Sequence, residues 1–139
     1  MKIKTTAEIA DFLEEHFACF VCWPRARLEE WVDWYLRKRF IATVVDETER
    51  LVAVGLGRPV GRVEDAETPY AFDEAGEVFY VESMATLHKA AIPALLKSLK
   101  VRSPQATRLA FRRRKRPARR VAVYNVNRFV NLMKGGNNG

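Results

Sequence analysis

Apolar residues recur at helical spacing in two stretches near the start of the chain. Thr5 and Glu8 form a capping box, which predicts that a first amphipathic helix covers residues 6–17. Pro24 marks the start of a second helix, and the basic residues at 37–39 are typical of a helix C-terminus. The apolar stripe of this second helix consists of Leu28, Trp31, Val32 and Tyr35. We therefore expect two amphipathic helices before the first strand.

Three tryptophans, Trp23, Trp31 and Trp34, lie in or beside the second stripe. A row of exposed tryptophans would suit the stacking of nucleic-acid bases. Helical spacing beside Leu and Val residues is more typical of a core and its rim. We therefore interpret the three rings as core and rim.

The pattern then changes from helical to extended. Residues 40–45 and 51–60 are apolar and β-prone, which predicts two strands, and the polar residues 46–50 predict a hairpin loop between them. Gly55 and Gly57 indicate a bulge or the close approach of another backbone. Because the apolar character is continuous, both faces of this sheet should be covered.

The stretch at 77–100 reads as a strand, a tight turn and a helix. Residues 78–81 form an apolar, β-prone run. Pro93 fits only in a first helical turn, so the helix should begin near residues 90–92. The acidic loop before this stretch, at 61–76, is long enough to be typical of a lid or a mobile insertion, and it could fold back on the basic tail.

The remaining elements predict the fold class. Residues 107–111 and 121–124 read as strands, and residues 125–133 read as a helix. A hairpin followed by strand, helix and strand indicates an α/β (α+β) fold with a mixed, mostly antiparallel sheet and helices on both faces. We expect one domain over residues 1–134, followed by a flexible tail at 135–139.

Charge is distributed unevenly along the 139 residues, whose net charge is +7. Residues 1–99 hold 12 Lys and Arg against 17 Asp and Glu, a balance of −5. Residues 100–139 hold 12 Lys and Arg and no acid, a balance of +12. A tail without carboxylates needs an acidic neighbour within the chain or a phosphate-bearing partner.

Membrane insertion and export are not expected. No apolar run approaches the ~18 residues that a spanning helix requires. Acidic residues stand near the N-terminus, where a signal peptide would be apolar. The sequence therefore predicts a cytoplasmic protein that does not enter a membrane.

Cys19 and Cys22 form a C-x-x-C pair, with His16 three residues before it. A structural zinc site would need a fourth ligand, and only His88 and carboxylates remain for that role. Without a second C-x-x-C the metal interpretation is weak. We expect two buried thiols beside the apolar residues 17–23 and no metal.

The order of elements resembles that of the GNAT superfamily of N-acetyltransferases. In that family the fourth strand splays from the fifth and acetyl-CoA lies in the gap. The turn after the fourth strand carries Arg/Gln-x-x-Gly-x-Gly/Ala, whose N–H groups hold the pyrophosphate. Residues 78–85 resemble this strand, and His88, Lys89, Ala90 and Ala91 stand in the turn. Two alanines thus replace the glycines, which allows less close approach to a phosphate.

A second likeness lies near the C-terminus. Residues 121–136 are similar to the family's strand followed by Asn-x-x-Ala-x-x-x-Tyr, and Asn127 and Val130 match in place. The tyrosine that often serves as general acid is Lys134 here, or Met133 with a one-residue shift, so Tyr124 is the candidate to replace it. The chain also resembles small phage-encoded GNAT-like proteins.

The resemblance implies acetyl transfer from acetyl-CoA to an amine. Glu82 is the candidate base, because it lies in an apolar strand, and the alternative is an ion pair with an arginine. Tyr124 is the candidate acid. The backbone of Ser83, Met84 and Ala85 would contact the pantetheine, and a cleft should open between residues 81–85 and 107–111. A degenerate relative without activity would keep only the fold.

Two other classes of function stay open. The basic segment at 100–120 predicts a nucleic-acid-binding module that contacts phosphates without sequence preference. Its densest part consists of Arg112, Arg113, Arg114, Lys115, Arg116, Arg119 and Arg120. The third class is a non-catalytic protein that docks an acidic protein partner, which would need an exposed apolar patch.

Overall fold

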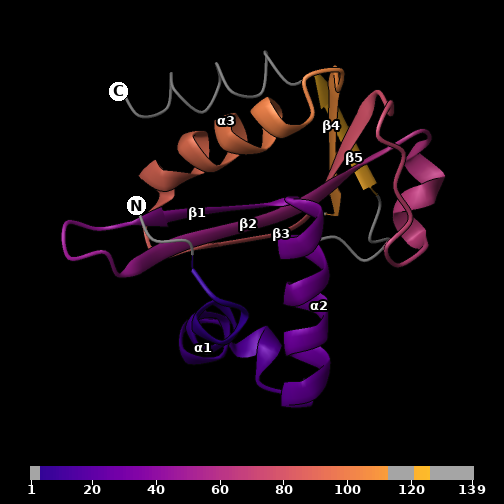
Figure 1. Cartoon of the computed structure of the whole chain (residues 1–139). Helices are drawn as coiled ribbons and strands as arrows, with labels where there is room; N and C mark the ends of the chain where they lie inside the picture. The colour runs from indigo at the N-terminus through magenta and orange to yellow at the C-terminus, as the bar shows by residue number, and fades with distance from the viewer. Residues whose placement is uncertain (1–3, 113–120, 126–139) are drawn as a thin grey trace.

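The computed structural model describes the backbone of residues 4–112 and 121–125 and the side chains of residues 4–111. Its strands are β1 (Ile41–Val45), β2 (Leu51–Val60), β3 (Val78–Thr86), β4 (Arg108–Arg112) and β5 (Val121–Asn125). They form one sheet in the order β1-β2-β3-β4-β5 (Figure 1). Neighbouring strands are antiparallel except β3 and β4, which are parallel. The prediction of a mixed, mostly antiparallel sheet is therefore confirmed.

Two helices, α1 (Thr6–His16) and α2 (Arg25–Lys38), cover one face of the sheet (Figure 1). The predicted capping box starts α1, with Thr5 accepting from the Glu8 N–H and Glu8 accepting from the Thr5 N–H. Arg39 ends α2 in the left-handed conformation, with φ of 63°. The buried side chains of both helices pack in one core with Val54, Leu56 and Ala85 of the sheet.

A third helix, α3 (Ile92–Arg102), covers the opposite face of the sheet (Figure 1). Pro93 lies in its first turn, as predicted. Leu95, Leu96 and Leu99 are buried against Phe79 and other apolar residues of β1–β4. Both faces of the sheet are thus covered, which confirms the prediction drawn from its continuous apolar strands.

A bulge interrupts the pairing of β2 with β3. Leu56 pairs with Ser83, but the next residue, Gly57, pairs with Val81, so Glu82 is the extra residue. A Cβ atom on Gly57 would overlap the Phe79 ring and lie 2.8 Å from the Tyr80 carbonyl oxygen. Gly57 therefore permits β3 to approach β2 closely, as a glycine inside an apolar strand predicted.

Strands β3 and β4 are paired for only part of their length. Their parallel register runs from Val78↔Arg108 to Val81↔Phe111. Strand β3 then continues to Thr86 with β2 as its partner. The two strands consequently part at Val81, close to the bulge at Glu82.

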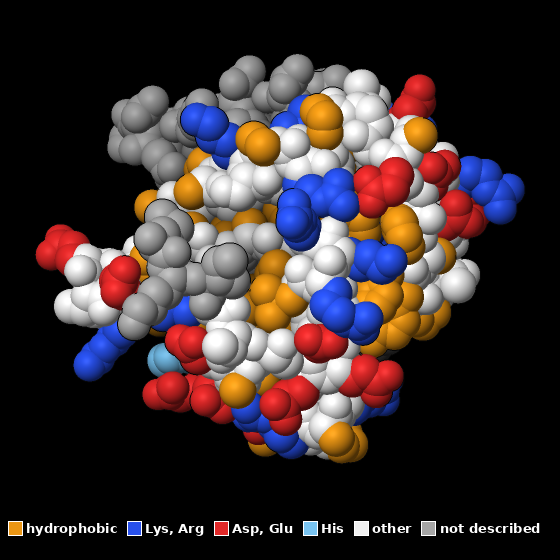
Figure 2. Space-filling model, viewed as in Figure 1, with side chains coloured by type: hydrophobic (Ala, Val, Ile, Leu, Met, Phe, Trp, Pro, Cys, Tyr) orange, Lys and Arg blue, Asp and Glu red, His pale blue; other side chains and the backbone are white. Residues whose placement is uncertain are grey.

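The loop at 61–76 contains a short 3-10 helix, Val63–Glu67, and lies at one end of the sheet (Figure 1). The Asp73 N–H donates to the Pro59 carbonyl, and Glu74 forms an ion pair with Arg102 at 3.0 Å. In Figure 2, acidic side chains gather at the right-hand edge beside a band of Lys and Arg side chains. The loop therefore contacts the end of α3.

The aromatic residues occupy the positions expected of a core and its rim. Trp31 is 8 % exposed, and Trp23 and Trp34 are half-buried against the same core. The prediction for the cysteines is wrong, since Cys19 and Cys22 are both exposed. The short 3-10 helix Ala18–Phe20 has Phe20 as its buried residue, so the thiols face outward.

Several predictions concern residues that the structure does not describe. These include residues 126–133 of the predicted helix, the tail at 135–139 and the basic residues at 113–120. Asn125, predicted as the start of that helix, is instead the last residue of β5. The single domain over 1–134 also stays a prediction. Among the helices in the described part of the chain, none is both long and apolar enough to cross a membrane.

Candidate functional site

A cavity of about 1310 Å³ opens where β3 and β4 part. One wall, which we call the apolar half, comes from β3, β4 and α3. It consists of Val81, Met84, Ile92, Leu96, Leu109 and Phe111. The other wall, which we call the aromatic half, comes from the residues around α2 and from the 61–76 loop. Its rings are those of Trp23, Trp31, Tyr35 and Tyr70.

Arg58 lies between the aromatic half and the sheet, with 1 % of its surface exposed. Each of its five guanidinium N–H groups has an acceptor. Nη1 donates to the Tyr35 hydroxyl and to Glu82, both at 2.9 Å. The other three acceptors are backbone carbonyls of the loop, those of Ala66, Thr68 and Ala71. A lysine has three donors, so it could not replace this arginine.

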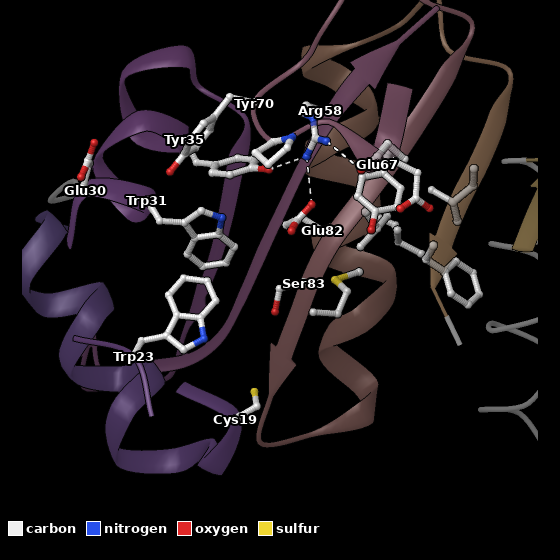
Figure 3. Close-up of a pocket in the computed structure, with 18 of the residues that line it drawn as sticks. Cys19, Trp23, Glu30, Trp31, Tyr35, Arg58, Glu67, Tyr70, Glu82 and Ser83 are labelled. Carbon is white, nitrogen blue, oxygen red and sulfur yellow. Dashed lines mark hydrogen bonds and ion pairs between the residues drawn. The ribbon is translucent and has the colours of Figure 1, made fainter. Parts of the chain in front are cut away.

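The bonds of Arg58 position three parts of the cavity at once. Figure 3 shows the Tyr35 hydroxyl and the Glu82 carboxylate turned towards the same guanidinium group. Because the carbonyl bonds also hold the loop, residues such as Glu67 and Tyr70 come to line the same cavity. The Arg58 guanidinium further lies 5.1 Å from the centre of the Tyr80 ring. A single buried cation therefore organises the polar side of the site.

Glu82 lies at the bulge and lines the cavity on the same face of β3 as Tyr80, so Arg58 contacts both residues. Its side chain is 30 % exposed and forms an ion pair with Arg58 through Oε2. An ion pair with an arginine, which was the alternative to a role of Glu82 as a base, is thus present. It holds the carboxylate in place while part of the group stays open to the cavity.

Tyr35 supplies a neutral hydroxyl beside this ion pair. Burial raises the pKa of its phenol above the ordinary value of 10.0, and the nearby charge of Glu82 raises it further. The phenol oxygen accepts from Arg58, which leaves the hydroxyl hydrogen free to donate. Tyr35 is therefore a hydrogen-bond donor at the cavity wall rather than a base.

The predicted cofactor residues fall into two groups. Ser83 and Met84 line the cavity with Glu82, whereas Ala85 is 1 % exposed and packs in the core under α1 and α2. The turn from β3 to α3 lies beyond the lining. Its residues His88, Lys89 and Ala90 are exposed, and Ala91 is buried.

Hydrogen bonds to the backbone of His88 fix the conformation of the β3–α3 turn. The Thr86 hydroxyl donates to the His88 carbonyl and accepts from the His88 N–H. The Ala91 N–H donates to the same carbonyl, which begins the 3-10 turn before α3. The exposed side of the turn therefore presents Lys89 next to the start of a helix.

Tyr124 belongs to β5, where its backbone pairs with Leu109 of β4. The pairing of β4 with β5 thus brings the Tyr124 backbone close to Leu109, which lines the cavity. The Tyr124 side chain lies outside the described atoms, so its role as general acid stays a prediction. Arg112 ends β4, and its side chain and the basic residues at 113–120 also lie outside the description.

Two basic residues at the start of the basic segment have structural partners. The Lys100 ammonium donates to the carbonyls of Pro104 and Ala106. Arg102 pairs with Glu74 and donates to the Lys38 carbonyl. These two cations thus have partners within the chain at the C-terminal end of α3. The nucleic-acid hypothesis therefore depends on the arginines that follow β4.

Sequence reasoning did not find Arg58, Tyr35 or Tyr70 as site residues. One signal was present, since Arg58 is a charged residue inside the otherwise apolar run at 51–60. A buried charge in a strand demands partners, and such a demand often marks a functional site. Tyr35 gave no comparable signal, because core and cavity rings on a helix share the same spacing, and Tyr70 lies in a loop without periodicity.

The described residues contain no group of three or more His, Cys, Asp and Glu side chains that could hold a metal ion. Cys19 lines the lower end of the cavity in Figure 3. No family model matches the chain, and a search of curated proteins found no relative.

Proposed function

We propose that this protein is an acyl-CoA-dependent N-acyltransferase of the GNAT type, with acetyl-CoA as the acyl donor. The observation that carries the proposal is the cavity between β3 and β4, which the Glu82 carboxylate lines at the position of the bulge. In the GNAT family that the chain resembles, acetyl-CoA lies in the gap between two strands that part. The apolar half of the cavity provides such a gap, since β3 pairs with β4 only as far as Val81.

The reaction converts an ammonium ion and an acyl thioester into an amide and a thiol. The ammonium first loses a proton, and its nitrogen lone pair then forms a bond to the thioester carbonyl carbon. The tetrahedral intermediate collapses as the carbon–sulfur bond breaks and the thiolate leaves with that electron pair. The nitrogen gives up a second proton and the thiolate takes one, so one proton is released overall.

Glu82 is suited to accept the first proton, directly or through a water molecule. Its Oε2 atom accepts from Arg58, and the carboxylate is only partly buried. Tyr124 is the proposed acid for the thiolate, because its strand lies next to β4 at the cavity. Ser83, which is 8 % exposed, would orient the thioester from the neighbouring position on β3.

The phosphates of CoA would extend from the cavity towards the β3–α3 turn. Ile92, the first residue of α3, lines the cavity, so the turn before it adjoins the apolar half. The exposed Lys89 and the helix N-terminus beside it would favour an anion. We place the reaction in the cytoplasm, where exposed thiols such as Cys19 and Cys22 stay reduced.

Isothermal titration with acetyl-CoA and with CoA at moderate salt tests this proposal. We expect micromolar binding that weakens about tenfold in Lys89→Glu, because a like charge then faces the phosphates. Lys97→Glu is the matched control, since Lys97 is an exposed lysine within α3 rather than in the turn before it. No binding at millimolar ligand, or an equal loss in both variants, would overturn the proposal.

A further inference from the structure

The cavity is larger than one ligand requires. Sites for drug-sized ligands typically measure about 300–1000 Å³, whereas this cavity measures about 1310 Å³. Its two halves also differ in chemistry, with aliphatic side chains on one wall and tryptophan and tyrosine rings on the other. The second half therefore has room for a ligand of its own.

The rings of the aromatic half form a continuous wall. Trp23 and Trp31 meet edge to face with centres 5.1 Å apart, and Trp31 meets Tyr35 in the same way at 5.5 Å. Figure 3 shows the two indoles one above the other, across from Ser83 of β3. Both indoles line the cavity, and the faces of aromatic rings attract cations.

Tyr70 extends this wall across the loop. Its ring centre lies 4.8 Å from that of Trp34, which meets Tyr35 edge to face at 4.9 Å, so Tyr70 connects to the wall through Trp34. The backbone of Tyr70 has φ of 63°. A bulky residue rarely adopts a positive φ, and such strain is concentrated at functional sites. The loop is held in this conformation by the three carbonyls that accept from Arg58.

The charges of the cavity favour a cation over an anion. The lining includes the carboxylates of Glu30, Glu67 and Glu82, and the cations Arg27 and Arg58. Arg58 has no N–H group left for an anionic ligand, because all five are bonded. Arg27 is exposed and already stacks on Trp23, 5.3 Å from the ring centre, so this ring does accept a cation.

We propose that the aromatic half binds a primary amine with an aromatic or similarly flat apolar body, in its ammonium form. The body would lie along Trp23, Trp31 and Tyr70, and the ammonium group would face Glu82. The proposal deepens the proposed function, on which it rests, by assigning the acceptor substrate. It can be tested separately, because amine binding needs no acyl-CoA.

Tryptophan fluorescence gives a direct readout, since Trp23 and Trp31 line the cavity. We would titrate the full chain, without CoA, with 2-phenylethylamine, its neutral analogue 2-phenylethanol, and ethylamine, which lacks the ring. The aromatic amine should bind about tenfold more tightly than either analogue, because only it combines ring stacking with a cation.

Matched variants locate the site. Tyr70→Ala should weaken amine binding several-fold, whereas Phe72→Ala should not. Both residues belong to the loop and contact Trp34, with exposures of 36 % and 38 %, but only Tyr70 lines the cavity. Arg27→Ala should tighten binding several-fold, because it removes a competing cation from Trp23.

The outcomes separate the two proposals. Equal affinity for 2-phenylethylamine and 2-phenylethanol would overturn the amine site, as would equal effects of Tyr70→Ala and Phe72→Ala. Acetyl-CoA binding without any amine binding at millimolar concentration would overturn the amine site and leave the proposed function standing. Selective amine binding without acetyl-CoA binding would support the site and overturn the transferase.

Discussion

The two halves of the cavity are built by different physical means. The aromatic half depends on one buried cation, Arg58, whose five hydrogen bonds connect β2 to α2, to the bulge of β3 and to the loop. The apolar half depends on the packing of α3 against β3 and β4. A polar network of this kind is strong only while every member is paired, whereas apolar packing loses stability in proportion to the volume removed.

The difference indicates which half specifies geometry. Five directed bonds leave Arg58 one arrangement, so Glu82 and Tyr35 are held in position before any ligand binds. Aliphatic side chains such as Leu96 and Met84 impose shape without direction. We infer that the aromatic half orients the reacting group, and that the apolar half accommodates the donor's chain.

The largest effect should come from removing Arg58. Arg58→Met leaves the Glu82 charge and three loop carbonyls without their partner, so we expect a loss of about 3–5 kcal/mol in the free energy of unfolding. Urea unfolding followed by circular dichroism measures this loss. Arg62→Met is the control, since Arg62 is an exposed arginine of the same loop and should cost less than about 0.5 kcal/mol. Equal costs would contradict the role given to Arg58.

The second-largest effect should come from Gly57, at the bulge between the two halves of the cavity. Gly57→Ala would place a methyl group against the Phe79 ring and the Tyr80 carbonyl, which should destabilise the fold by about 2 kcal/mol. Gly55→Ala is the matched control, because its methyl group would meet the flexible end of Met84 at 3.0 Å. A smaller cost for Gly57→Ala than for Gly55→Ala, measured by the same urea unfolding, would show that the bulge does not need its glycine.

Tyr35→Phe tests the hydroxyl and its pH dependence. Loss of the bond to Arg58 should cost about 1–2 kcal/mol at neutral pH. Because the folded state raises the pKa of this phenol, its neutral form stabilises the fold below pH 10.0, and this contribution is lost as the pH rises above that value. Stability should therefore fall less steeply above pH 10.0 in Tyr35→Phe than in the unmodified chain, by unfolding measured across that range. Identical slopes would contradict the burial of this phenol.

The smallest effect should come from the surface pair outside both halves. The hydrogen bond from Arg102 lowers the pKa of Glu74, so the pair contributes stability above the ordinary value of 4.5 and loses it as the pH falls. The pair is exposed, and Glu74→Gln should cost no more than about 0.5 kcal/mol at pH 7. A cost as large as that of Tyr35→Phe would show that the loop is held mainly by this pair.

Much of the fold follows from local pattern. The capping box at Thr5, the alternation of strands and the position of Pro93 each depend on neighbouring residues, so the boundaries of α1, β2 and α3 were predictable. Strand β3 extends five residues beyond the apolar run at 78–81, to Thr86. The family resemblance placed the end of this strand at residue 85, but the apolar pattern alone did not, because the extension depends on pairing with β2.

The site was less predictable than the fold for the same reason. Glu82 was found because a carboxylate in an apolar strand is conspicuous, but its partner Arg58 lies 24 residues away. The exposure of Cys19 and Cys22 was missed because a short 3-10 turn has no periodicity from which to infer its inward face. Long-range pairing and irregular turns are where sequence patterns carry least information.

Acyl transfer itself is the most direct test of the account. We would incubate the full chain with acetyl-CoA and a panel of primary amines that includes 2-phenylethylamine, and detect the N-acetylated amine by mass spectrometry. Detection of the released CoA with a thiol-reactive reagent is unsuitable, because the exposed thiols of Cys19 and Cys22 would also react. Glu82→Gln removes the proposed base, and Glu77→Gln is the control at an exposed glutamate just before β3.

We predict that the unmodified chain and Glu77→Gln form the amide at similar rates. Glu82→Gln should be at least about 100-fold slower, as expected for loss of a general base. Absence of product from the unmodified chain with every amine, or an undiminished rate in Glu82→Gln, would contradict the claim that this cavity transfers acyl groups.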